Sequence, residues 1–159
     1  MLELPAPLIR QIQDQAFAQY PGECCGLLMG PADGRGISRC LPLENIADRL
    51  HALDPAAYPR TSRDAFMVNE AKLQRLVREA EAVGERWQAF YHSHIDCGAY
   101  FSAEDKRFAA PDGAAVFPEV IQLVVACTAQ AITEAKAFRW DGRDFALLQD
   151  LPAFVRSRA

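Results

Sequence analysis

Several features that would assign the protein to a specialised class are missing from its sequence. No apolar run approaches the roughly 20 residues of a membrane-spanning helix. The first residues, Met-Leu-Glu-Leu-Pro-Ala-Pro, show no basic segment followed by an apolar one, as a signal peptide has. There is no basic excess either, because 17 lysines and arginines against 21 acidic residues give a net charge of −4. We therefore expect no membrane partner and no nucleic-acid partner.

The cysteines do not form the pattern of a disulfide framework. Their number, five, is odd, and Cys24 and Cys25 are adjacent, so a reduced cytoplasmic location is the simplest interpretation. Cys24, Cys25 and Cys127 lie in apolar stretches, and we expect them to act as small core residues.

The composition is that of an ordinary globular domain. Half of the 159 residues are hydrophobic and 24% are charged. No internal repeat or low-complexity segment interrupts the chain, and its length suffices for one sizeable core. We expect a single domain over residues 1–159.

Apolar spacing predicts three helices and several strands. The helices are expected over residues 5–20, after a capping residue at Asn69 as far as Gly84, and from Ser102 to about Ala110. Strands are predicted over residues 24–29, 36–43, 65–68, 87–94, 120–127, 134–140 and 144–148, the last two joined by a turn at Asp141-Gly142. Residues 46–63 are predicted to form a long loop. Helices around a mixed sheet indicate an α+β or α/β fold.

The strand at 87–94 carries the most informative residues. Side chains of a strand alternate between its faces, so one face is expected to carry Trp87, Ala89 and Tyr91 and the other Phe90, His92 and His94. The two imidazoles can then converge on one metal ion, and Asp105 adds a carboxylate. Two histidines and one aspartate leave the fourth position of a tetrahedral zinc open for water, which is the arrangement of a catalytic site.

A structural role also accounts for part of this pattern. Ser102 followed by Asp105 resembles a helix capping box, with aspartate in place of the usual glutamate or glutamine, and the carboxylate favours the positive end of the helix dipole. The position of the helix supports the metal site, because its start follows the histidines after only seven residues. A connection that short returns the first helical turn to the neighbourhood of the imidazoles.

The complete pattern resembles one protein family. Glu23, then His92-Ser93-His94, seven intervening residues, Ser102 and Asp105 are similar in order and spacing to the motif of the JAMM (JAB1/MPN/Mov34) metallopeptidases. The segment Glu-Cys-Cys-Gly-Leu-Leu at residues 23–28 is similar to the corresponding strand of the compact prokaryotic members. The resemblance implies an MPN/JAB-type α+β domain with a mixed, mostly antiparallel sheet flanked by helices.

The resemblance also implies a role for each residue of the motif. His92, His94 and Asp105 would hold one zinc ion per chain. Glu23 would hold the attacking water as general base and then pass the proton to the leaving amine, and Ser102 would donate a hydrogen bond to the developing oxyanion. These roles agree with the chemistry, because zinc lowers the pKa of water to about 7 and an adjacent carboxylate can take its proton.

Three nearby residues stay without a firm assignment. Many relatives have proline directly after the second histidine, where this chain has Ile95, which affects the loop at 95–101 but removes no ligand. Cys97 in that loop is either a further zinc ligand or a partly exposed thiol without a role. His51, in the segment 46–63, has no partner in the sequence.

The family resemblance implies a substrate with a flexible tail ending in Gly-Gly. Such tails belong to ubiquitin, ubiquitin-like proteins and small sulfur carriers of the ThiS or MoaD kind, and an extended tail can pair with an exposed strand edge. The alternatives are a non-catalytic MPN-type scaffold and a DNA-repair-associated protein like RadC, although no ligand of the motif is lost here. Zinc deaminases are disfavoured because their HxE and PCxxC signatures are absent. The oligomeric state stays open.

Overall fold

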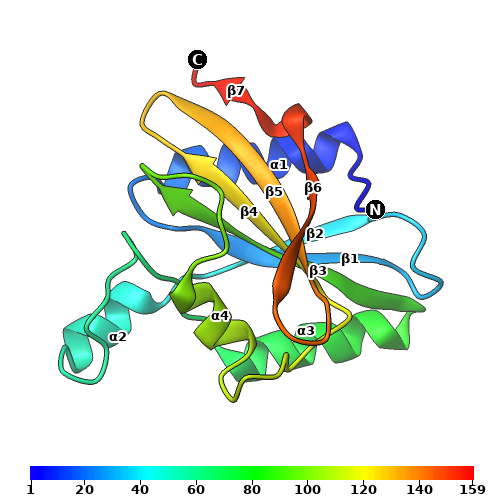
Figure 1. Ribbon diagram of the computed structural model, residues 1–159, viewed down its shortest axis with the longest axis horizontal. Coiled ribbons are helices and arrows are strands. Elements are labelled where there is room, and N and C mark those ends of the chain that lie inside the picture. Colours follow the sequence, from blue (N-terminus) through cyan, green and yellow to red (C-terminus); the bar gives the residue numbers. More distant parts are fainter.

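A seven-stranded mixed sheet organises the chain in the computed structural model, which describes residues 1–159 (Figure 1). The strand order is β2 (Arg39–Leu43), β1 (Cys25–Pro31), β3 (Glu85–Ile95), β4 (Ile121–Cys127), β5 (Ala131–Trp140) and β6 (Phe145–Asp150), and β7 (Arg156–Ser157) pairs with β5. Only β3 and β4 are parallel, and every other pair is antiparallel. The predicted α+β domain with a mixed, mostly antiparallel sheet is confirmed.

Helices cover both faces of this sheet, at opposite sides in Figure 1. Helix α1 (Ala6–Gln19) places Ile12, Ala16 and Phe17 in one apolar cluster with Tyr91 of β3. Helix α3 (Glu70–Ala82) places Leu73 and Ala80 in a second cluster with Phe90. Neighbouring residues of β3 therefore enter opposite halves of the core, as the period of two predicts.

The predicted ends of several elements are also confirmed. The Asn69 side chain accepts the N–H of Lys72 at the start of α3. In the β5–β6 turn, Asp141 accepts the N–H groups of Arg143 and Asp144, and Gly142 has φ +103°, which glycine adopts without strain. Strand β4 lies inside the sheet and is buried along its whole length, as its continuous apolar run predicts. No helix of the structure combines the length and apolarity needed to cross a membrane.

The prediction for the face of Trp87 is wrong because β3 contains a bulge. Ala89 pairs with Leu28 and Trp87 pairs with Met29, so Gln88 lies between them without a partner in β1. The extra residue reverses the alternation. Trp87 consequently packs against Phe90 instead of sharing a face with Tyr91.

Two predictions for the segment between β2 and α3 are also wrong. Residues 46–63 contain a short helix, α2 (Ala47–Leu53), which lies at the margin of the domain, away from the sheet (Figure 1). Only Ala47 of this helix is buried, so it lacks the apolar stripe by which helices are recognised in sequences. Residues 65–68 join no ladder of the sheet. The Asn45 side chain accepts the N–H of Met67 and donates to the Ala65 carbonyl in place of a neighbouring strand.

Two structural elements complete the chain. Helix α4 (Ala103–Ala109) lies in the crossover, residues 96–120, between the parallel strands β3 and β4. After β6, a 3-10 turn, η1 (Pro152–Phe154), buries Phe154 completely in the cluster beneath α1.

All five cysteines are free, and Cys24, Cys25 and Cys127 are buried as expected.

Candidate metal centre

Strand β3 and helix α4 bring His92, His94 and Asp105 together. The histidines lie two residues apart near the end of β3, and both are buried. Asp105 is the third residue of α4, and its carboxylate turns back toward the strand. Its Oδ1 lies 3.1 Å from His92 Nε2 and its Oδ2 lies 3.1 Å from His94 Nε2. One ligand atom from each residue falls within 4.8 Å of the others, as a shared metal ion requires.

The hydrogen bond of His94 indicates that a positively charged group belongs between its Nε2 and the Asp105 carboxylate. Its Nδ1 lies 2.9 Å from the Gly98 carbonyl oxygen, which only accepts, so Nδ1 carries the hydrogen. In the neutral ring, Nε2 then directs a lone pair at the Asp105 carboxylate. Two such acceptors at 3.1 Å need a proton or a metal ion between them, and a metal ion bound by both satisfies them without charging the ring.

His92 leads to the same conclusion by a different observation. The side chain is completely buried, yet neither ring nitrogen has a hydrogen-bond partner, and the approach of Nε2 to Asp105 lacks hydrogen-bond geometry. An unpaired buried polar group costs about 1–3 kcal/mol, and coordination of a metal ion removes that cost for the ring nitrogen that binds it. Two imidazoles and one carboxylate are a donor set that fits zinc with one open position.

The electrostatics keep the donor groups in their metal-binding forms. Burial lowers the pKa of His92 and outweighs the opposite effect of Asp105, which favours the neutral imidazole. Burial by itself raises the pKa of Asp105, but His92, His94 and the Ser102 N–H outweigh it and hold this pKa below its usual range. Asp105 therefore stays a carboxylate.

Glu23 lies beside this cluster, two residues before β1. The side chain is only 5% exposed, and its Oε1 has no hydrogen-bond partner. Burial, with the charges of Asp105 and Asp64, raises the pKa of Glu23 to about 9, and Arg60 opposes the increase only in part. A divalent cation near two such carboxyl groups favours their ionised forms. The geometry therefore suits a carboxylate that works next to a metal ion.

Ser102 forms the capping box that the sequence pattern suggests. Its Oγ accepts the N–H of Asp105 at 3.1 Å, and its own N–H donates to Asp105 Oδ2 at 2.9 Å. The box fixes the direction of the Asp105 carboxylate. The hydroxyl hydrogen of Ser102 is not used by the cap and remains free to donate. Capping and catalysis are thus compatible roles for one side chain.

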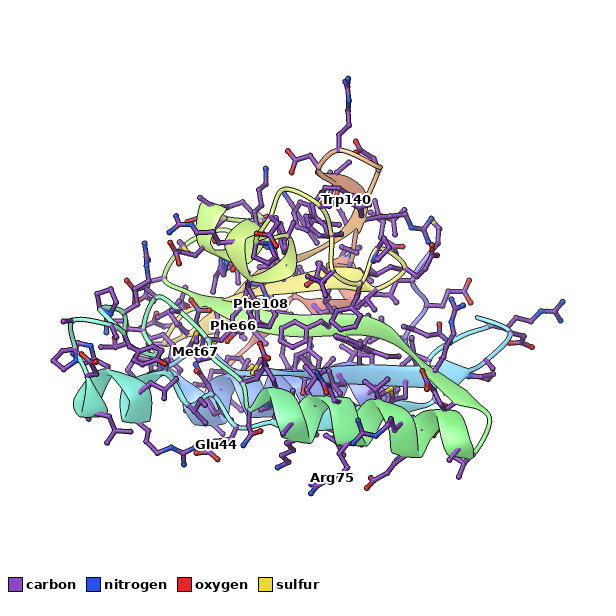
Figure 2. The ribbon with its side chains drawn as sticks, turned by 90° about the horizontal axis from the view of Figure 1, so that it is seen from below. Glu44, Phe66, Met67, Arg75, Phe108 and Trp140 are labelled. Atoms are coloured by element: carbon purple, nitrogen blue, oxygen red, sulfur yellow. The ribbon has the colours of Figure 1, made fainter.

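Two cavities meet at the cluster. The first, of about 530 Å³, is lined by Asp105 together with Phe66, Met67 and Phe108. Phe66 and Phe108 lie against each other, with ring centroids 4.7 Å apart (Figure 2). The second cavity, of about 360 Å³, is lined by Glu23, His94 and Ser102. The residues common to both linings are Arg60, Glu104 and Arg107. The two cavities therefore adjoin at these three residues and together form one cleft, to which the cluster contributes Asp105 in the first half and His94 in the second.

The sequence pattern gives no firm role to three other residues, Cys97, His51 and Arg60. Cys97 is exposed and lines the second cavity, but its sulfur is not among the grouped ligand atoms. His51 lies on α2, where its Nδ1 contacts the Tyr58 carbonyl oxygen at 2.7 Å. Arg60 was missed because nothing local marks it. Only the folding of the 46–63 segment brings it to Glu104, at 3.4 Å.

Comparisons with known proteins agree with this geometry. The family described as prokaryotic homologues of the JAB domain matches residues 5–141. A desampylase of Haloferax volcanii is 25% identical over 138 residues, which cover 87% of this chain and 84% of that protein.

Solved structures show the same fold. The protein DSY2949 of Desulfitobacterium hafniense has a TM-score of 0.61 at 23% identity, covering 92% of this chain and 90% of its own. AF2198, a JAB1/MPN domain protein of Archaeoglobus fulgidus, has a TM-score of 0.52 at 15% identity, covering 93% of this chain and 94% of its own.

Proposed function

Because the chain belongs to the family of prokaryotic JAB-domain proteins, we propose that it is a zinc-dependent peptidase or isopeptidase that hydrolyses the bond after the C-terminal Gly-Gly of a ubiquitin-like protein. The observation that carries the proposal is the buried cluster of His92, His94 and Asp105, with the unpaired carboxyl group of Glu23 in the adjoining cavity. The desampylase relative, named for the removal of the ubiquitin-like modifier Samp, supports the substrate class. Small sulfur-carrier proteins with the same Gly-Gly tail are included among the proposed substrates.

The residues of the cleft divide the chemistry among them. His92, His94 and Asp105 hold zinc, which supplies the Lewis acidity that makes water a nucleophile near neutral pH. Glu23 takes a proton from the attacking water and delivers it to the leaving amine. Ser102 donates its hydroxyl hydrogen to the oxygen that becomes negative during the attack.

The first cavity offers a place for an extended tail. Both backbone groups of Met67 are bonded, the N–H to the Asn45 side chain and the carbonyl to the N–H of Ile46. The N–H and carbonyl of Phe66, by contrast, make no hydrogen bond within the protein. Phe66 lines the first cavity, so a substrate tail can pair with these groups as an added strand. Glycine residues let such a backbone approach closely.

The test is mass spectrometry of β-grasp proteins whose Gly-Gly tail is followed by an extension. We expect cleavage after the second glycine, and a sharp decrease when the penultimate glycine is replaced by valine, because the added side chain has no space beside the metal. The Glu23→Gln variant serves as the inactive control. The proposal is contradicted if the valine-substituted tail is cleaved as fast as the Gly-Gly tail. It is also contradicted if unrelated peptides are cleaved while no Gly-Gly protein is.

A further inference from the structure

The two halves of the cleft give the substrate a direction. Glu23 delivers the proton to the leaving amine in the proposed reaction, and it lines the second cavity but not the first. Phe66, with its unpaired backbone groups, lines only the first. The tail up to the second glycine therefore occupies the first cavity, and the leaving group occupies the second. This orientation, and the role it gives to the second cavity, rests on the proposed function.

Half of the residues that line the second cavity are acidic or basic. Its twelve lining residues include three acidic residues, Glu23, Asp64 and Glu104, and three arginines, Arg60, Arg63 and Arg107. A lysine-linked leaving group would place an uncharged four-carbon stem here. Only four hydrophobic residues line the cavity, namely Ile95, Cys97, Tyr100 and Ala103. The chemistry of the lining suits a charged leaving group better than an aliphatic one.

Two of the three arginines already have close carboxylate partners. Glu104 contacts Arg107 at 2.6 Å and Arg60 at 3.4 Å. Asp64 contacts Arg60 at 3.3 Å. The pair between Arg60 and Glu104 joins the segment before α3 to helix α4, whereas the other two lie within one region each.

Arg63 is different, because its one ion pair is long and exposed. Its Nη2 lies 3.6 Å from Asp96 Oδ2, and its side chain is 65% exposed. Asp96 does not line the cavity, and both its oxygens lie 2.9 Å from the Tyr20 hydroxyl, which remains as a partner if Arg63 leaves. An exposed pair of this kind is held weakly, so the guanidinium can exchange Asp96 for another carboxylate.

We propose that Arg63 binds the free α-carboxylate of the leaving residue, so that the enzyme preferentially removes a single C-terminal residue beyond Gly-Gly. Hydrolysis adds water across the peptide bond and leaves a carboxylate on the glycine and an amine on the released residue. The guanidinium fork matches the two oxygens of the released residue's own carboxylate. A protein attached through a lysine side chain offers no such carboxylate next to the bond.

The experiment compares three versions of one β-grasp protein: Gly-Gly-Ala with a free carboxylate, Gly-Gly-Ala with a C-terminal amide, and Gly-Gly linked to the side-chain amine of an acetyl-lysine amide. We expect the wild-type kcat/KM to be about tenfold higher for the acid than for the amide, the effect of one partly exposed charged hydrogen bond. Arg63→Gln reduces this ratio to near one, and Arg63→Lys retains part of it. Arg49→Gln is the matched control, because Arg49 is exposed to a similar extent and pairs with Glu44 outside the cavity.

Binding gives a second readout that does not depend on turnover. In the Glu23→Gln variant, calorimetric titration with the two alanine-extended proteins should show about tenfold tighter binding of the acid, and adding Arg63→Gln should remove the difference. An acid-to-amide ratio near one in the wild type, a ratio that Arg63→Gln leaves intact, or faster cleavage of the lysine-linked protein overturns the inference alone. Cleavage of none of the three proteins contradicts the proposed function and the inference with it.

Discussion

The two walls of the cleft are built in different ways. The wall with His92, His94 and Asp105 consists of a strand inside the sheet and a capped helix, and its side chains are buried. The facing wall, residues 44–69, consists of a short helix and irregular chain whose arginines are exposed. Regular, buried structure holds groups to the precision that a metal ion needs, whereas exposed side chains can adapt to a substrate. In the proposed function, the first wall carries the metal chemistry and the second wall contacts the substrate.

The largest expected effect is the loss of zinc from the buried wall. His92→Ala or His94→Ala removes one of three protein ligands, so the content measured by elemental analysis should fall from about one zinc per chain to nearly none. His51→Ala is the matched control, since this histidine lies on α2 outside the cluster. A protein that neither carries zinc when purified nor takes it up on addition contradicts the assignment.

The next effect is the loss of turnover in Glu23→Gln. The amide keeps the shape of the side chain but cannot act as a base, so the rate should fall on the order of 10²- to 10⁴-fold while zinc and fold are retained. Steady-state kinetics with elemental analysis of the same sample measure both properties. Nearly normal hydrolysis by this variant is incompatible with the proposed role of Glu23.

Ser102→Ala should affect catalysis and stability together. Loss of the oxyanion donor lowers kcat on the order of 10²-fold with a smaller change in KM. Loss of the N-cap costs about 1 kcal/mol of stability, measurable by denaturant unfolding. Asn69→Ala removes the corresponding cap from α3 and controls for the second effect. If Asn69→Ala lowers kcat as much as Ser102→Ala does, the hydroxyl has no special part in the reaction.

The smallest effect is expected in the exposed wall. Arg49→Gln breaks a surface ion pair with Glu44 at 3.3 Å, which contributes at most about 1 kcal/mol. Stability by denaturant unfolding and turnover of a Gly-Gly substrate should both stay close to wild type. A large decrease in either would show that this wall is more tightly coupled to the metal cluster than its exposure indicates.

The period of a strand and the pattern of a helix cap were sufficient to predict the positions of His92, His94 and Asp105. The two-residue period of a strand placed His92 and His94 together, and the capping box pointed Asp105 at the start of its helix. The same period predicted the wrong face for Trp87, because the bulge at Gln88 depends on pairing with β1 and has no local signal. The strand predicted at residues 65–68 does not form, because the Asn45 side chain takes hydrogen bonds that a neighbouring strand would make.

The sequence by itself predicted most of the strands, three of the four α-helices and a group of two histidines and one aspartate able to hold a metal ion, since periodicity, capping and donor chemistry act along short stretches of chain. The roles expected of Glu23 and Ser102 came from the family resemblance. Tertiary structure decided how the 44–69 segment folds over the cluster, which divides the cleft in two and brings Arg60 to Glu104. It also decided that Arg63 keeps only a long contact with Asp96. The physical reason is that contacts between exposed residues far apart in the chain arise from the packing of whole elements, and no local pattern of residues encodes them.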